Sequence, residues 1–366
     1  MEDISDDKTG LELEDEIAQL EARLAEAKQR LGLRRSRRDR GTETETATGA
    51  TTTASSSESI GGSSSIPTRT PTRSSTQSPP PPSSLLADPS YHHLLLLSDS
   101  ALPLGSFAFS SGLESYIAHA RPPPPSSSSS SVPYHYYYKP TLSSFLPLSL
   151  SSYASTNLPF CLAAFCAVVE ENEKEKGKSG SGSALAEELI DLDDALDASI
   201  VCAVGRRAST AQGRALLSIW EKSLCVSVSV PGAPGVKALQ EFSTALRGLN
   251  KNNTLNNDEE IPASISAHLA PLFGAVAACL GLSAEQTAYV FLLSHAKALV
   301  SAAVRAGLFG PYQAQRVLAG ADVQRLIAGL VDREWRTPVE EAAQSVPVID
   351  LWVGRHEMLY SRIFNS

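Results

Sequence analysis

Cysteine is scarce in this sequence, and no two cysteines have the spacing of a redox motif. The five cysteines, at positions 161, 166, 202, 225 and 279, form no C-x-x-C motif in 366 residues. They stand among apolar or helix-forming neighbours, which is typical of reduced, buried thiols. The N-terminus is acidic and has no apolar core of the kind found in secretory signals. We therefore expect a protein of a reducing compartment, the cytoplasm.

Basic charge and long apolar runs are also scarce. The formal net charge is -9, whereas binding nucleic acid requires lysine and arginine concentrated on one face. Residues 34–40 form the one dense arginine cluster, and a solvated charge run is favoured there over an import signal or a nucleic-acid arm. The longest weakly polar run, residues 270–284, is shorter than the roughly 20 residues that cross a bilayer. The sequence therefore predicts neither a nucleic-acid nor a membrane partner.

A complete catalytic motif is the third absence. Residues 177–179 come nearest to a phosphate-binding loop, but Asn172 stands where the first glycine of that motif belongs. Ser294 and Lys297 have the serine-to-lysine spacing of some acyl-transferring enzymes, yet they fall in the middle of an expected helix. No histidine, cysteine or carboxylate cluster shows metal-ligand spacing. We expect no enzyme and no tightly bound metal or cofactor, and a hydrolase using Ser294 and Lys297 stays open as an alternative.

What the sequence does contain divides it into three parts. Residues 1–40 carry apolar side chains at spacings of 4, 3, 4, 3 and 4, which predicts a short coiled-coil helix with a basic end. Residues 41–84 are rich in Ser, Thr, Gly and Pro and predict a disordered linker, because they bury too little apolar area to offset chain entropy. Residues 85–366 form one apolar domain, whose low-complexity tracts near 122–133, 170–183 and 250–260 are expected to be loops outside the core.

Helix signals dominate the apolar domain. A capping box that starts at Ser283 and a C-cap glycine at Gly307 bound one helix. This helix is apolar on nearly every face, so it is expected to be buried at the centre of the domain. Its polar residues Lys297, Ser301 and Arg305 recur every four positions and therefore lie on one narrow stripe.

Two further helix starts and one strand-like segment complete the pattern. Pro311 opens a helix as its first residue, and Thr337 with Glu340 makes a second capping box that has Pro338 at the first helical position. Only residues 225–230 alternate as a strand does. Because one short strand cannot form a sheet, the predicted fold class is all-α, a compact helical domain preceded by the coiled-coil helix and the linker.

Two dense stretches lie near the ends of the helical domain. Residues 97–114 combine a proline and two phenylalanines with Gly105 and Gly112, which permit close backbone approach, and with Glu114, which suits a helix start. Residues 356–366 alternate aromatic, cationic and apolar side chains. Against a partner this tail would bury its rings while its arginine meets a carboxylate or carbonyls. The alternative, that the tail closes the domain's own core, remains open.

Two arginines form a further candidate site. Arg207 and Arg214 are seven residues apart and would share one face of a helix. On composition alone a surface ion pair is the favoured interpretation for Arg214. An interface anchor is the alternative, because arginine is enriched in binding hot spots.

Together these motifs resemble the UreF family of urease accessory proteins over about residues 85–366. Each motif alone is common, whereas their order along the chain is specific. The residues that carry the resemblance are Ser98, Asp99, Pro103, Gly105, Phe107, Ser110, Gly112, Leu113, Glu114, Leu192, Asp193, Arg207, Ser209, Gly213, Arg214, His268, Phe273, Gly274, Leu280, Leu282, Val300, Arg305, Gly310, Gln315, His356, Glu357, Leu359, Tyr360, Arg362 and Phe364. The Ser/Pro-rich tracts suggest a eukaryotic, fungal-type version.

The resemblance implies an all-α scaffold that is not itself an enzyme. It would bridge a UreD-type (also called UreH) accessory protein and a UreG-type GTPase for nickel insertion into apo-urease, as a homodimer within that complex. Nickel would be handled by the complex and not bound tightly by this chain. The residues expected to contact partners are Asp99, Glu114, Arg207, Arg214, Lys297, Arg305, Gln315, His356, Glu357, Tyr360, Arg362 and Phe364. A coiled-coil adaptor unrelated to urease is the alternative function.

Overall fold

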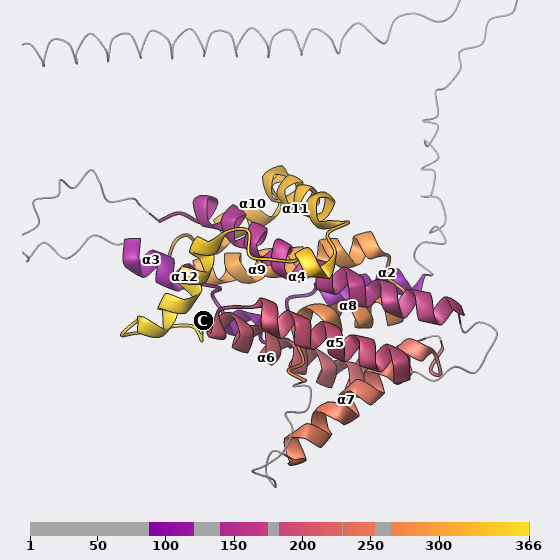
Figure 1. Ribbon diagram of the computed structural model, residues 1–366. Coiled ribbons are helices and arrows are strands. Elements are labelled where there is room, and N and C mark those ends of the chain that lie inside the picture. The colour runs from indigo at the N-terminus through magenta and orange to yellow at the C-terminus, as the bar shows by residue number, and fades with distance from the viewer. Residues whose placement is uncertain (1–87, 121–139, 175–182, 229, 253–264, 366) are drawn as a thin grey trace, which may run out of the picture. The chain divides into compact units, whose positions relative to one another are not determined.

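The structure, a computed structural model of the chain, describes residues 88–120, 140–174, 183–228, 230–252 and 265–365 (Figure 1). All of these residues belong to the second of the chain's two units, residues 78–366. The predicted coiled coil in residues 1–40, the predicted linker of residues 41–84 and the tract at residues 122–133 lie outside the described residues.

Every regular element in the described part of the chain is helical, which confirms the predicted all-α fold. The α-helices are α2 (Pro89–Ser98), α3 (Leu113–Ala120), α4 (Leu142–Lys174), α5 (Ser183–Ser199), α6 (Ala203–Ile219), α7 (Pro234–Asn252), α8 (Leu269–Cys279), α9 (Ala284–Arg305), α10 (Pro311–Leu318), α11 (Ala321–Glu334) and α12 (Pro347–Arg355). Short 3-10 turns are η2 (Ser106–Ala108), η5 (Cys225–Ser227), η6 (Val339–Glu341) and η7 (His356–Met358), and η4 (Trp220–Leu224) is a π-helical turn.

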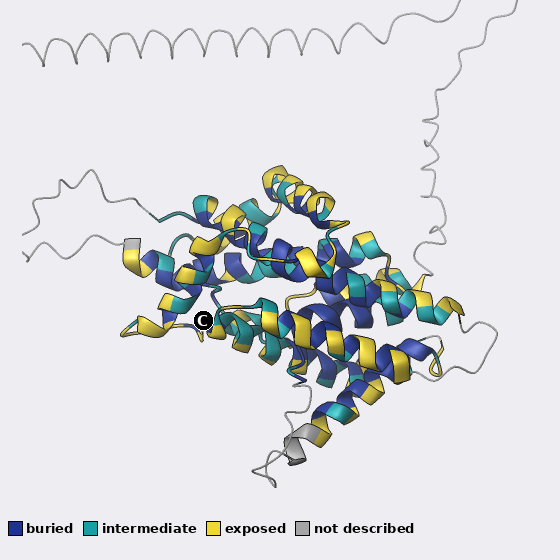
Figure 2. Cartoon of the chain, viewed as in Figure 1, coloured by how far each residue is buried: buried dark blue, intermediate teal, exposed yellow. Residues whose placement is uncertain are grey.

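Helices α4, α8 and α9 form the centre of the core. They pack against one another, and Figure 2 shows buried residues concentrated along them. Phe160 of α4, Phe273 of α8 and Phe291 of α9 are almost fully buried, and the rings of Phe273 and Phe291 lie 5.3 Å apart. Each such ring contributes about 1.5–3 kcal/mol by leaving water. The predicted burial of the helix between Ser283 and Gly307 is thus confirmed.

Two helices, α4 and α9, are long and apolar enough to cross a membrane by length and composition alone. Polar residues interrupt the apolar residues of both helices, so neither forms an unbroken apolar run in the sequence. Within this fold, 78% of the apolar window of α4 and 56% of that of α9 are buried. Other helices therefore cover these surfaces, as they do in the core of a helical domain.

Helix α9 begins and ends where its local signals predict. The Ser283 hydroxyl accepts a hydrogen bond from the Gln286 amide (3.2 Å), and Gln286 Oε1 accepts one from the Ser283 amide (2.9 Å). Gly307 follows the last turn with a φ of 76°, in the left-handed region that favours glycine. Pro311 opens α10 as predicted.

Two local predictions were wrong. Residues 225–230 do not form a strand but begin with the η5 turn, and Val226 is 80% exposed, so the alternating valines have no neighbouring strand to pack on. Thr337 does not cap an α-helix either. Its hydroxyl donates to Glu334 Oε2 (3.0 Å) at the end of the preceding helix, and only the short η6 turn follows.

Two tracts expected to be loops are partly helical, and the cysteines are less buried than predicted. Helix α4 continues through residues 170–174, where Lys174 Nζ lies 3.7 Å from Glu170 Oε2 one turn earlier, and α7 runs to Asn252.

All five cysteines are free thiols, but only Cys161 is fully buried and Cys166 is exposed. The prediction that all five are buried was therefore wrong, because local apolar neighbours do not determine which helix face a residue occupies.

Gly274 of α8 lies directly against the backbone of α4, where an added Cβ would stand 1.9 Å from the Cys161 carbonyl oxygen. We expect Gly274→Ala to lower the free energy of unfolding by about 3 kcal/mol or more, because the two helices must separate. At Gly329 of α11 nothing lies within 4 Å of such a Cβ, so the control Gly329→Ala should be neutral or stabilising by about 0.5–1 kcal/mol. Equal urea midpoints for Gly274→Ala and the wild type would contradict this close packing.

Candidate functional site

The polar stripe of α9 holds the loop that joins α2 to α3. Lys297 Nζ donates a hydrogen bond to the Ser98 carbonyl, and the Arg305 guanidinium donates one to the Phe107 carbonyl. The stripe therefore fixes the end of α2 and the loop that follows it to the central helix. Lys297 and Arg305, both expected to contact partners, have these intramolecular acceptors in the structure.

Two glycines give the same loop its shape. Gly105 and Gly112 have φ values of 74° and 84°, in the region that residues with a Cβ rarely adopt. At Gly112 a Cβ would also lie 2.9 Å from the Val353 amide nitrogen of α12. The predicted close approach is therefore found at Gly112 but not at Gly105, where nothing lies within 4 Å of an added Cβ. The ring of Phe107 in this loop is 67% exposed.

Glu114 ties the C-terminal tail to the start of α3. Its Oε2 accepts hydrogen bonds from His356 Nε2 (3.0 Å) and the Phe364 amide (3.2 Å), and its Oε1 accepts one from the Ile363 amide (2.7 Å). Glu114 is 8% exposed and His356 is 0% exposed. A carboxylate is stable at such burial only when hydrogen-bond donors replace water. We name the three contacts of Glu114 with His356, Ile363 and Phe364 the tail clamp.

The last described residues pack into the chain's own core. Phe364 is 4% exposed, and Arg305 Cζ lies 4.4 Å from the centre of its ring. The Asn365 amide donates to the Ala108 carbonyl (2.8 Å). For Phe364 and His356 the structure thus favours the alternative that the tail closes the domain's own core.

Between its two anchors the tail turns large side chains outward. Tyr360 is fully exposed, Ile363 is 63% exposed, and Met358 and Arg362 are exposed as well. Figure 2 shows the tail beside the C mark largely in the colour of exposed residues. We name the side chains of Met358, Tyr360, Arg362 and Ile363 the tail surface.

An ion pair connects this tail to α6. Arg207 pairs with Glu357 of η7, and the Arg207 guanidinium lowers the pKa of Glu357 below its ordinary value. Arg214, on the same helix, forms no ion pair with any described residue, although composition favoured a surface ion pair. Its Nε donates instead to the Ser266 carbonyl (3.2 Å).

Two predicted contact residues lie apart from this cluster. Asp99 accepts a hydrogen bond from the Ala101 amide (2.9 Å) just after α2, and Gln315 is exposed on α10. In the described ranges of the chain, no hydrogen bond or ion pair links either side chain to α6 or to the tail.

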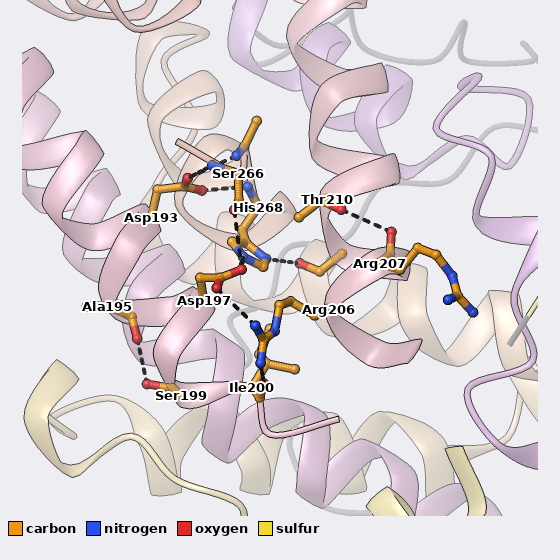
Figure 3. Close-up of polar contacts among 12 residues, drawn as sticks. Asp193, Ala195, Asp197, Ser199, Ile200, Arg206, Arg207, Thr210, Ser266 and His268 are labelled. Carbon is orange, nitrogen blue, oxygen red and sulfur yellow. Dashed lines mark hydrogen bonds and ion pairs between the residues drawn. The ribbon is translucent and has the colours of Figure 1, made fainter. Parts of the chain in front are cut away.

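A second buried carboxylate organises the segment before α8 (Figure 3). Asp193 of α5 accepts hydrogen bonds from the amides of Ser266 (2.7 Å), Ala267 (2.9 Å) and His268 (2.5 Å). Ala267 has a φ of 64°, which is costly for a residue with a Cβ. Burial raises the pKa of Asp193, while the three amides and His268 oppose that shift. The carboxylate therefore stabilises a strained turn.

His268 extends this network from α5 to α6, as Figure 3 shows. One ring nitrogen, Nε2, lies 2.9 Å from Asp197 Oδ1, and the other, Nδ1, lies 3.0 Å from Ser209 Oγ. Serine, histidine and aspartate also make such contacts in hydrolases. Here, however, the histidine is fully buried, and Ser209 Oγ accepts the Leu269 amide (3.3 Å) at the start of α8. We interpret the network as the attachment of α5 and α6 to α8.

Neither carboxylate network was predicted from the sequence. Asp193, Ser209 and His268 carried the resemblance without an assigned role, and Glu114 was expected to open a helix and to contact a partner, not to bind the tail. One signal was available: Asp193 and Asp197 are four residues apart and so share a face of α5.

The described side chains give little support to a hydrolase that uses Ser294 and Lys297 or to a metal site. Lys297 donates to the Ser98 carbonyl, and no described hydrogen bond joins it to Ser294. Within the described residues, no group of three or more His, Cys, Asp or Glu side chains is placed to hold a metal ion.

Known urease accessory proteins are similar to this sequence. The family model described as UreF matches residues 139–322. An uncharacterized urease accessory protein UreF-like of Schizosaccharomyces pombe is 34% identical over 270 residues, which cover 74% of this chain and 94% of that protein. Urease accessory protein 6 of Cryptococcus neoformans is 29% identical over 310 residues (74% and 95%), and urease accessory protein F of Arabidopsis thaliana is 28% identical over 275 residues (74% and 90%).

Replacing Glu114 tests the tail clamp. Glu114→Gln keeps one acceptor oxygen but turns an NH2 group toward N–H donors, and an unsatisfied buried polar group costs about 1–3 kcal/mol. We expect the Ile363 and Phe364 amides to exchange with deuterated solvent at least about tenfold faster, as measured by hydrogen exchange. Glu340→Gln removes an exposed carboxylate outside the tail and serves as the control. Unchanged exchange in Glu114→Gln would contradict the clamp.

Proposed function

This chain belongs to the UreF family of urease accessory proteins, and we propose that it is the scaffold that bridges a UreD-type (UreH) accessory protein and a UreG-type GTPase for nickel insertion into apo-urease. In this proposal the chain is not an enzyme. Nickel is the cargo of the assembled complex, and this chain does not hold it tightly as a cofactor. The complex works in the cytoplasm and contains a homodimer of the chain.

The observation that carries the proposal is the tail surface held by the tail clamp. Tyrosine and arginine are the residue types that dominate binding hot spots, and Tyr360 and Arg362 stand outward between two buried anchors. Because His356 and Phe364 fix the backbone on either side, less conformational entropy is lost when a partner binds the segment. We assign this surface to the UreD-type partner.

A scaffold needs more than one surface, and the other predicted contacts lie elsewhere. Gln315 is on α10 and Arg214 is on α6, which Figure 1 shows at opposite sides of the domain from one another. Asp99 follows α2. We propose these positions as contacts to the GTPase and to the second copy of the chain, while the tail surface is occupied by the UreD-type protein.

Point substitutions on the tail surface test the assignment more sharply than deleting the tail, because deletion would also remove the buried Phe364. Tyr360→Ala combined with Arg362→Ala should weaken binding to the UreD-type partner at least about tenfold, since hot-spot truncations cost about 2 kcal/mol or more. The helical circular dichroism signal should be unchanged, because both side chains are exposed. Affinity is measured by calorimetry on the purified proteins.

Tyr91→Ala is the matched control, since Tyr91 is a partly exposed tyrosine on α2, toward the other end of the domain in Figure 1. It should bind the partner like the wild type and support nickel-dependent urease activation in a reconstituted system. Full affinity in the Tyr360/Arg362 double variant would refute the tail assignment. Loss of urease activation on deleting residues 1–84, with UreD-type binding intact, would instead favour the coiled-coil adaptor.

A further inference from the structure

A cavity of about 140 Å³, partly open to solvent, lies in the domain and has no part in the proposed scaffold. It is bounded by the loop after α2 and by α4, α6, α8, α9 and α12. Ser106, Thr156, Ser209, His295 and Asp350 are among its lining residues. An engineered cavity of about 150 Å³ in another protein holds one benzene molecule. The volume therefore suits a single small organic molecule and is too small for a peptide segment.

The apolar part of the cavity wall is aromatic. Tyr153, Phe273 and Phe291 all line it. Tyr153 stacks on His295 with ring centres 3.9 Å apart and planes 4° apart, and it stacks on Phe291 at 5.2 Å. Aromatic faces carry negative electrostatic potential and attract cations. This wall therefore accepts either an aromatic ring or the alkyl part of an ammonium ion.

The polar part of the wall supplies hydroxyl groups. Ser149 Oγ lies 3.1 Å from His295 Nε2, and Ser152 and Ser294 also line the cavity. Burial lowers the pKa of His295 to about 3, so this imidazole is neutral at pH 7. Burial also raises the pKa of Tyr153, which keeps the phenol neutral. None of these groups offers a positive charge to an anion.

Asp350 is the one carboxylate in the described lining. Burial raises its pKa, and a hydrogen bond with Gln344 partly opposes that shift. No described lining residue is lysine or arginine, and no ion pair of Asp350 occurs among the described residues. A partly buried carboxylate without a cationic neighbour is stabilised when a positively charged ligand reaches it.

We propose that this cavity binds a small organic primary ammonium ion, whose charged group meets Asp350 and whose apolar part lies against the aromatic wall. A hard metal cation fits less well, because Ca²⁺ and Mg²⁺ favour several oxygen ligands around one ion and the described lining has a single carboxylate. An anion is disfavoured by the same carboxylate.

The proposal is tested with three probes of nearly equal size: benzylamine, benzyl alcohol and benzoate. Each is titrated into the full-length wild-type protein at pH 7 and followed by ligand-observed NMR. We expect benzylamine to bind at least about tenfold more tightly than benzyl alcohol, since a hydrogen bond between two charged groups is stronger than one to a neutral hydroxyl, and we expect benzoate not to bind. Equal affinity for the amine and the alcohol, or no binding of the amine, overturns the proposal. This comparison needs no variant.

Two variants locate the binding site. Asp350→Asn should reduce benzylamine affinity to that of benzyl alcohol, while Asp332→Asn, which removes an exposed carboxylate of α11, should leave it unchanged. Retained preference for the amine in Asp350→Asn would overturn the assignment to this cavity. If Asp350→Asn does not fold, Ala298→Phe places a ring into the cavity from α9. It should abolish binding of both neutral and charged probes, and undiminished binding would equally place the site elsewhere.

Discussion

The buried carboxylate of Glu114 is the constraint on which the candidate docking surface depends. Out of water it requires donors, and those that reach it are the His356 imidazole and the amides of Ile363 and Phe364. Hydrogen bonds to charged groups contribute about 1.5–3 kcal/mol each, so the backbone of the tail is held while the side chains between its anchors stay outside. Arg305 reinforces the arrangement, since one guanidinium both binds the loop and covers the Phe364 ring.

Asp193 repeats the same physical solution on another side of the domain. There a carboxylate collects three backbone amides and holds Ala267 in a left-handed conformation at the start of α8. In both places the helices pack through apolar contact, and a buried carboxylate organises the irregular backbone between them. This division explains how a fold with few charged groups in its core positions its loops.

The sequence predicted what is local and failed where contacts are distant. The caps at Ser283 and Gly307 and the polar stripe of α9 depend on residues within a few turns, and the structure has all of them. The partners of Glu114 lie about 240 residues further along the chain, beyond any periodicity argument. Thr337 is an exception, because its predicted helix cap rested on a local signal and was still wrong. Its hydroxyl donates a hydrogen bond to the Glu334 carboxylate one turn earlier and does not cap a following helix. The alternation of aromatic, cationic and apolar residues in the tail did not determine which side chains face the core. In the structure His356 and Phe364 are buried, whereas Tyr360 and Ile363 are exposed.

In the proposed function, Glu114 holds the backbone of the tail from inside the domain, while Tyr360 and Arg362 face outward to bind a partner. Hydrogen exchange of the intact protein, alone and bound to a UreD-type protein, tests this claim most directly. We predict that the amides of Ile363 and Phe364 are protected in both states, while residues 357–362 gain protection only in the complex. A complex that forms without new protection in residues 357–362 would contradict it.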